Sequence, residues 1–156
     1  MIRKTLDLIL SRLLIIIMSV MVVNVVWQVA SRYILQSPST FTDELAGFLL
    51  IWLGLLGAAY LTGQNGHLAI DLLLDKLTGK NKMILDAIIR MLILFFAVSV
   101  LIIGGIRLVY LTFVLEQLSS VLQISLGYIY VVLPISGFII AYYCIDDLFH
   151  LKSNAN

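Results

Sequence analysis

The stretch that decides the fold is FTDELAGFLLIWLGLLGAAYLTGQNGHLAIDLLLDKL, residues 41–77. Two acids, Asp43 and Glu44, stand near its start, and an apolar run follows them to about residue 62. About 20 apolar residues are enough for a helix to cross the hydrocarbon core of a membrane. After a turn at Asn65-Gly66, residues 67–77 repeat polar side chains at helical spacing but are too few to span. We therefore expect a transmembrane helix followed by an amphipathic helix in the membrane interface.

The rest of the chain has the same character. Of its 156 residues, 62% are hydrophobic and only 12% are charged, whereas a soluble domain carries about 25% charged residues. Four apolar runs reach membrane length, at about 10–33, 41–62, 84–110 and 122–149. The sequence thus predicts an all-α integral membrane protein, a single four-helix domain over residues 1–156. The first run is too long for a signal peptide and lacks a small-x-small cleavage site, so we expect a retained anchor.

The distribution of charge predicts the orientation. Positively charged residues gather in short cytoplasmic segments. Seven basic residues lie before or at the start of the first run, between the second and third runs, and after the fourth: Arg3, Lys4, Arg12, Lys76, Lys80, Lys82 and Lys152. On the opposite side of the membrane, Arg32 and Arg107 are the only basic residues expected. Both termini are therefore expected in the cytoplasm.

The acids at the start of the second run need separate explanations. Thr40 with Asp43 three residues later fits a capping box, and the positive end of the helix dipole favours an acid there. Glu44 lies close to the hydrocarbon boundary, where an unpaired acid is costly. Its expected partner is either Arg32 at the end of the first run or a basic group on a partner protein.

Small residues mark one face of the second run. Gly47, Gly54 and Ala58 fall near this face, with Gly57 beside it, and such residues let another helix approach closely. Trp52 lies near the middle of the run, too deep for an interfacial belt, so we expect it to pack in the interior or against a partner.

Polar residues also occur at helical spacing elsewhere. His67 and Asp71 are four residues apart on the polar side of the expected interfacial helix. A metal site would need more ligands, so capping or docking to a partner is the favoured role. Asp86 and Arg90 have the same spacing, which predicts an ion pair reached by a snorkelling guanidinium. The functional alternative is that Arg90 binds a substrate anion.

Two further features concern helix packing. Asn24 and Gln28 share one face of the first run and are expected to bond to a neighbouring helix. Pro134 removes a backbone hydrogen bond and should bend the fourth run, where Gly137 and Ala141 form a small-xxx-small step.

Several classes of function lack the residues they need. Cys144 is the only cysteine, which excludes a CxxC redox pair and a cysteine-based zinc site. No nucleophile motif, phosphate loop or metal cluster is present, so we expect no enzyme, no cofactor in this chain and no nucleic-acid partner. A subunit rich in packing surfaces fits the chain better.

The residues from 31 to 73 resemble the signature region of the small, Q-type membrane subunit of tripartite ATP-independent periplasmic (TRAP) transporters. That pattern is carried here, in order, by Arg32-Tyr33, Phe41, Glu44, Trp52, Gly57-Ala58, Gly66-His67 and Asp71. One departure from the pattern is Phe41, where the family more often has tryptophan. The order and spacing of these elements, rather than any single one, carry the resemblance.

The resemblance implies a place in a bacterial inner-membrane complex. A periplasmic binding protein would deliver an organic acid, such as a C4-dicarboxylate or sialic acid, to a large multi-spanning subunit that moves it inward with sodium. The small subunit would extend the scaffold, contact membrane lipid and help the binding protein dock.

Two readings from other classes compete. A self-sufficient proton-coupled exporter acting as a homodimer would need an embedded acid, for which Glu44 is the candidate. A four-helix membrane enzyme would need clustered catalytic residues, and the Asp86–Arg90 pair alone is too little.

Overall fold

The computed structural model describes residues 2–37, 39–64 and 80–153. Its helices, in chain order, are α1 (Ile2–Tyr33), α2 (Thr40–Gly63), α4 (Lys80–Phe96), the π-helix η1 (Ala97–Gly104), α5 (Gly105–Val114), α6 (Leu126–Tyr130) and α7 (Val132–Ser153). The expected interfacial helix at about 67–77, with His67 and Asp71, lies outside the described residues.

Four helical segments of the described chain are long and apolar enough to cross a membrane, which confirms the four predicted spans. They are Arg3–Tyr33, Thr40–Gly63, Ile84–Val114 and Leu126–Phe149. The fourth begins four residues later than its apolar run, because residues 115–125 form a tight loop with an isolated antiparallel bridge between Leu118 and Ser125.

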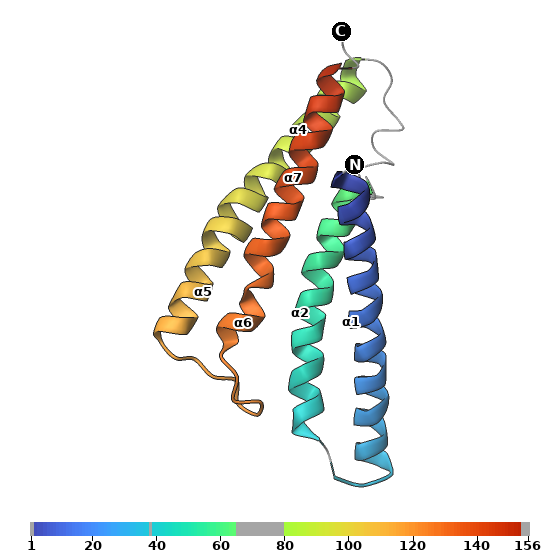
Figure 1. The fold of residues 1–156 in the computed structure, drawn as a ribbon, viewed down its shortest axis with the longest axis vertical. Coiled ribbons are helices and arrows are strands. Elements are labelled where there is room, and N and C mark those ends of the chain that lie inside the picture. Colours follow the sequence, from blue (N-terminus) through green and yellow to red (C-terminus); the bar gives the residue numbers. More distant parts are fainter. Residues whose placement is uncertain (1, 38, 65–79, 154–156) are drawn as a thin grey trace.

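The helices form two pairs that meet along α7. Helix α1 packs on α2, while α4, η1 and α5 follow α7, which lies between them and α2 (Figure 1). Almost half of the most apolar part of the fourth span, which consists of α6 and most of α7, is buried, against less than a fifth in each of the other spans. α7 is therefore the central helix. We call the end where α1 begins and α7 ends the termini end, and the opposite end the loop end.

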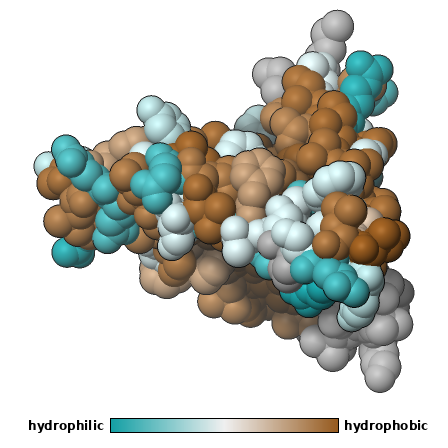
Figure 2. All heavy atoms as spheres, turned by 90° about the horizontal axis from the view of Figure 1, so that it is seen from below, coloured by the Kyte–Doolittle hydropathy of each residue, from teal (hydrophilic) through white to brown (hydrophobic). Residues whose placement is uncertain are grey.

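The buried core is small and the lateral surface is apolar. One core cluster consists of Leu10, Ile17, Leu56, Val132 and Tyr143, and a second of Ala59, Ala97, Leu101, Ile140 and Cys144. Large apolar side chains on the lateral surfaces of the spans are exposed. Seen from the loop end, hydrophilic residues form patches in a largely hydrophobic outline (Figure 2). Such a surface suits lipid rather than water.

Close approach between the third span and α7 depends on a glycine on each side, Gly105 of α5 and Gly137 of α7. A methyl group added to Gly137 would lie 2.8 Å from Cβ of Leu101, and one added to Gly105 would lie 2.9 Å from Cβ of Leu133 and 3.0 Å from Cδ of Pro134. The fourth span is interrupted at Val131, between α6 and α7 and just before Pro134, as the missing N–H of proline predicts. The π-helical turns of η1 were not predicted.

Candidate functional site

An ion network joins the helices at the termini end. Nη1 of Arg3 lies 3.0 Å from Oδ2 of Asp146 and 2.6 Å from Oδ1 of Asp147, and its Nη2 donates to the Gly63 carbonyl at 2.6 Å. One side chain of α1 thereby contacts both α7 and the last residue of α2. Helix α1 begins eight residues before the apolar run that starts at about residue 10, and this contact joins its first turn to α2 and α7.

The third span enters the same network through Arg90. Its Nε donates to Oδ1 of Asp86 at 3.0 Å, which is the ion pair predicted from their spacing, and its Nη1 also pairs with Asp147. The Asp147 side chain is only 8% exposed and lies between two guanidinium groups. Because both basic groups neutralise it, this buried carboxylate avoids the cost of an unpaired charge near lipid.

Tyr143 completes the contact between α1 and α7. Its hydroxyl donates to Oδ1 of Asp7 at 2.5 Å, and its fully buried ring fits against Gly63, where an added methyl would come within 2.6 Å. The guanidinium of Arg3 lies 5.6 Å from the centre of the same ring, within the range of a cation–π contact. Four spans are thus held together at this end.

Glu44 has a partner at the loop end that the sequence did not suggest. Its carboxylate accepts from the backbone N–H groups of Ser120 (3.0 Å), Val121 (3.0 Å) and Leu122 (2.8 Å), and from Oγ of Ser119 (3.2 Å). We expected Arg32 or a basic group on a partner, and within the described residues the bonds go instead to the loop between α5 and α6. Successive N–H groups in a tight turn form a concavity that binds anions without needing a cation.

The loop itself is tightly built. Glu116 and Gln123 have φ angles of 48° and 55°, and the N–H of Ser119 donates to the Ile124 carbonyl at 2.9 Å. Leu126 closes the turn by donating to the Gln117 carbonyl at 3.0 Å. Glu44 therefore fixes an ordered loop to the start of α2, and it lies only about 6 Å from that end of the helix at 1.5 Å per residue. This depth does not suit the mid-membrane acid that an exporter would need.

The polar residues of α1 and the start of α2 bond to each other. Nδ2 of the buried Asn24 donates to the Thr42 carbonyl at 2.8 Å, and Nε2 of Gln28 donates to Asp43. This confirms their predicted role between helices. The predicted capping box is wrong, because the N-cap residue is Ser39 and its side chain makes no capping bond. The helix begins one residue earlier than a Thr40 cap requires.

Among the described residues, no segment covers the small-residue face of α2. A methyl added to Gly47, Gly54 or Gly57 would meet nothing within 4 Å, and Ala58 is exposed. Trp52, by contrast, packs beside the first core cluster and donates from Nε1 to the Ile129 carbonyl at 3.1 Å, close to the break before Pro134. Arg32 is exposed in the last turn of α1, where the helix dipole favours a basic group.

Sequence reasoning missed most of the network at the termini end. Arg3 was counted only as a topology signal, and the acids of α7 and Asp7 were given no role. The adjacent acids Asp146 and Asp147 at the end of an apolar run could have indicated this network, because acids near the hydrocarbon core need basic or hydrogen-bonding partners. Nothing in the sequence indicated Glu44's donors, since every loop residue except proline offers an N–H.

Comparison with known proteins places the chain in a family. Residues 6–153 match the family model described as "Tripartite ATP-independent periplasmic transporters, DctQ component". The chain belongs to this family. It is thus a multi-pass protein of the bacterial inner membrane and a component of a TRAP transporter.

Two curated relatives agree with this assignment. The sialic acid TRAP transporter small permease protein SiaQ of Vibrio cholerae is 24% identical over 151 residues, which cover 97% of this chain and 86% of the relative. A putative TRAP transporter small permease protein of Haemophilus influenzae is 34% identical over 85 residues, covering 54% of this chain and 53% of the relative. The first alignment extends over nearly the whole chain, so the likeness includes all four spans.

Proposed function

We propose that this chain is the small permease subunit of a sodium-driven TRAP transporter that takes up an organic acid. It would form part of the fixed scaffold of the large transport subunit and help the periplasmic binding protein to dock, without a substrate site of its own. The observation that carries this proposal is the use of the described polar groups. Arg3, Arg90 and Asp147 brace helix ends against one another, and Glu44 does the same at the loop end.

The open face of α2 is our candidate for the contact with the large subunit. Gly47, Gly54 and Ala58 leave room for another helix, and no segment of the described chain fills that room. Membrane helices associate through such close approach, because lipid provides no hydrophobic drive between them. His67 and Asp71 belong to the same proposal, as residues of the interfacial segment that braces the complex on the cytoplasmic side.

The loop held by Glu44 is our candidate for the docking role. With both termini in the cytoplasm, residues 115–125 lie on the periplasmic side. Their fixed backbone presents four exposed apolar side chains, Leu115, Leu118, Val121 and Ile124. A preformed loop loses less conformational entropy on binding than a flexible one.

The substrate is proposed as a carboxylate. The relative from Vibrio cholerae is named for sialic acid, and at 24% identity this suggests a candidate substrate rather than deciding it. C4-dicarboxylates and other organic acids are the remaining candidates within the class.

The test is co-purification followed by transport. The tagged chain is extracted from its native membranes in mild detergent, and a large multi-spanning subunit should accompany it in stoichiometric amount. Gly54→Leu should lower that yield by blocking helix approach. Gly104→Leu is the matched control, because it adds the same volume on η1, where an added methyl meets only a backbone oxygen at 3.8 Å.

The purified complex is then reconstituted with its binding protein. We expect uptake of a carboxylate that requires a sodium gradient. A homodimer with no large subunit would contradict the scaffold proposal, while a complex that transports without sodium would contradict only the coupling.

A further inference from the structure

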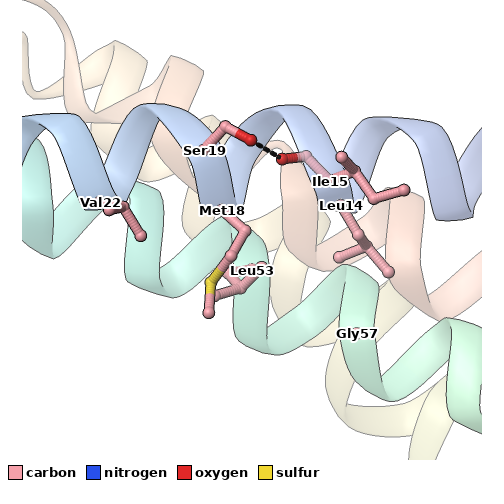
Figure 3. A pocket seen from close by; sticks show the side chains of 7 residues that line it. All are labelled: Leu14, Ile15, Met18, Ser19, Val22, Leu53 and Gly57. Atoms are coloured by element: carbon pink, nitrogen blue, oxygen red, sulfur yellow. Dashed lines mark hydrogen bonds between the residues drawn. The ribbon is translucent and has the colours of Figure 1, made fainter.

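A groove runs between α1 and α2 on the lateral surface of the bundle. It has a volume of about 680 Å³ and is lined on one side by Leu14, Ile15, Met18, Ser19 and Val22 and on the other by Leu53 and Gly57 (Figure 3). We call it the α1–α2 groove. Its volume is in the range of pockets that hold small molecules.

The lining of the groove favours a hydrocarbon occupant. Ser19 is its one polar side chain, and Oγ of Ser19 already donates to the Ile15 carbonyl at 2.8 Å (Figure 3). The Ser19 hydroxyl therefore does not need an occupant of the groove to accept its hydrogen bond. Gly57 leaves the α2 side open, since an added methyl would meet nothing within 4 Å.

The length of the groove matches one leaflet of a bilayer. Along α1 it extends from Leu14 to Val22, about 12 Å at 1.5 Å per residue. One leaflet accounts for about 15 Å of a hydrocarbon core of about 30 Å. About 20 residues of α1 cross that core, so a core that ends near Tyr33 begins near Leu14. A partner helix that crossed the whole membrane would need a groove about twice as long.

Two exposed basic residues lie at the termini end of the same side of α1. Lys4 is 11 residues before Ile15, about three full turns, and therefore shares its face. Arg12 lies three residues before Ile15 and seven before Ser19, on the adjoining part of that face. The other two charged side chains of this part of α1 contact α7: Arg3 pairs with Asp147, and Asp7 accepts a hydrogen bond from Tyr143.

We propose that the α1–α2 groove binds one acyl chain of an anionic phospholipid, whose headgroup phosphate contacts Arg12. The apolar lining accommodates the chain over the depth of one leaflet. Arg12 lies at the membrane boundary, two residues before Leu14, and together with Lys4 about two turns further out it favours an anionic over a zwitterionic headgroup. The site requires only that the chain lies in a membrane. A test of lipid binding is therefore independent of transport and of assembly with a large subunit.

Native mass spectrometry of the full chain, purified in mild detergent, tests the proposal. Phosphatidylglycerol and phosphatidylcholine are titrated separately, and the apparent Kd of the first bound lipid is measured for each. We expect tighter binding of phosphatidylglycerol. Arg12→Gln should weaken that binding about fivefold, whereas Arg107→Gln, which removes an exposed charge from α5, should leave it unchanged.

A second pair of variants tests the groove itself. Gly57→Leu should weaken binding of both lipids at least tenfold, since losing the burial of two methylene groups already has that effect. Gly104→Leu adds the same side chain on η1, outside the lining, and should leave the binding of both lipids unchanged. If Gly57→Leu loses helix content by circular dichroism, Ser19→Leu replaces it. Equal binding of the two lipids, or equal effects of the two glycine variants, would overturn the proposal.

Discussion

Among the charged residues of the network at the termini end, Asp147 should contribute most to the free energy of unfolding. Replacement by asparagine keeps the size of the side chain and removes its charge. Asp147 is 8% exposed and pairs with Arg3 and Arg90, whose side chains are 28% and 18% exposed. Breaking a buried ion pair by removing one partner costs about 3–5 kcal/mol. Because each arginine keeps a second carboxylate, we expect the lower end of that range, about 3 kcal/mol.

The assay is equilibrium unfolding in mixed micelles with increasing SDS, followed by helix content. Asp146→Asn is the matched control. Its carboxylate contacts Arg3 at 3.0 Å but is 29% exposed, and pairs that reach solvent contribute at most about 1 kcal/mol. Asp147→Asn should therefore lower the unfolding free energy about three times as much as Asp146→Asn.

A double-mutant cycle with Arg90→Gln sharpens this test. If the pair acts as a unit, the double variant should lose less than the sum of the single losses, with a coupling energy of about 1–3 kcal/mol. Equal effects of the two aspartate variants, together with a coupling near zero, would refute the view that Asp147 is the centre of the network.

Three other perturbations follow from the contacts. Gly137→Ala should destabilise the bundle by about 1–3 kcal/mol through overpacking, whereas Gly47→Ala, which meets no neighbour, should be neutral or slightly stabilising in the same unfolding assay. Glu44→Gln should speed hydrogen exchange of the loop amides that it binds, while Asp43→Asn leaves them protected because Asp43 accepts from α1 instead. Arg90→Ala should reduce the yield of folded complex and leave the transport KM unchanged; normal yield with a raised KM would indicate a substrate contact.

The sequence was sufficient wherever a contact is local or follows from lipid as solvent. Apolar runs of membrane length predicted the four spans, because backbone groups in lipid must bond within a helix. The spacing of Asp86 and Arg90 predicted their ion pair, and the lone amides Asn24 and Gln28 predicted bonds to a neighbouring helix. In each case the residue's own position restricts its possible partners to a few.

The sequence was insufficient where the partner depends on which helix ends meet. Arg3 and Asp147 are 144 positions apart, and their contact exists only because α1 and α7 converge at the termini end. The donors to Glu44 include backbone N–H groups, and the residue types of the loop do not indicate which N–H groups will bind a carboxylate. Small residues show where helices can approach closely but not where they do. Gly54 and Gly137 therefore look alike in sequence, yet only Gly137 has a close neighbour among the described residues.

The position of the polar contacts bears on whether this subunit moves. Arg3 links α1 to α7 at one end, and Glu44 links α2 to the loop before α6 at the other. Separating the two helix pairs at either end would expose a carboxylate near lipid without its donors, which is costly. Between the ends the pairs meet mainly through apolar packing, in the core cluster that joins Leu56 of α2 to Val132 of α7, and sliding would force this close packing to rearrange. A bundle fastened at both ends and closely packed between them resists hinge and shear motions. This supports our proposal that the large subunit moves while this subunit is part of the fixed scaffold.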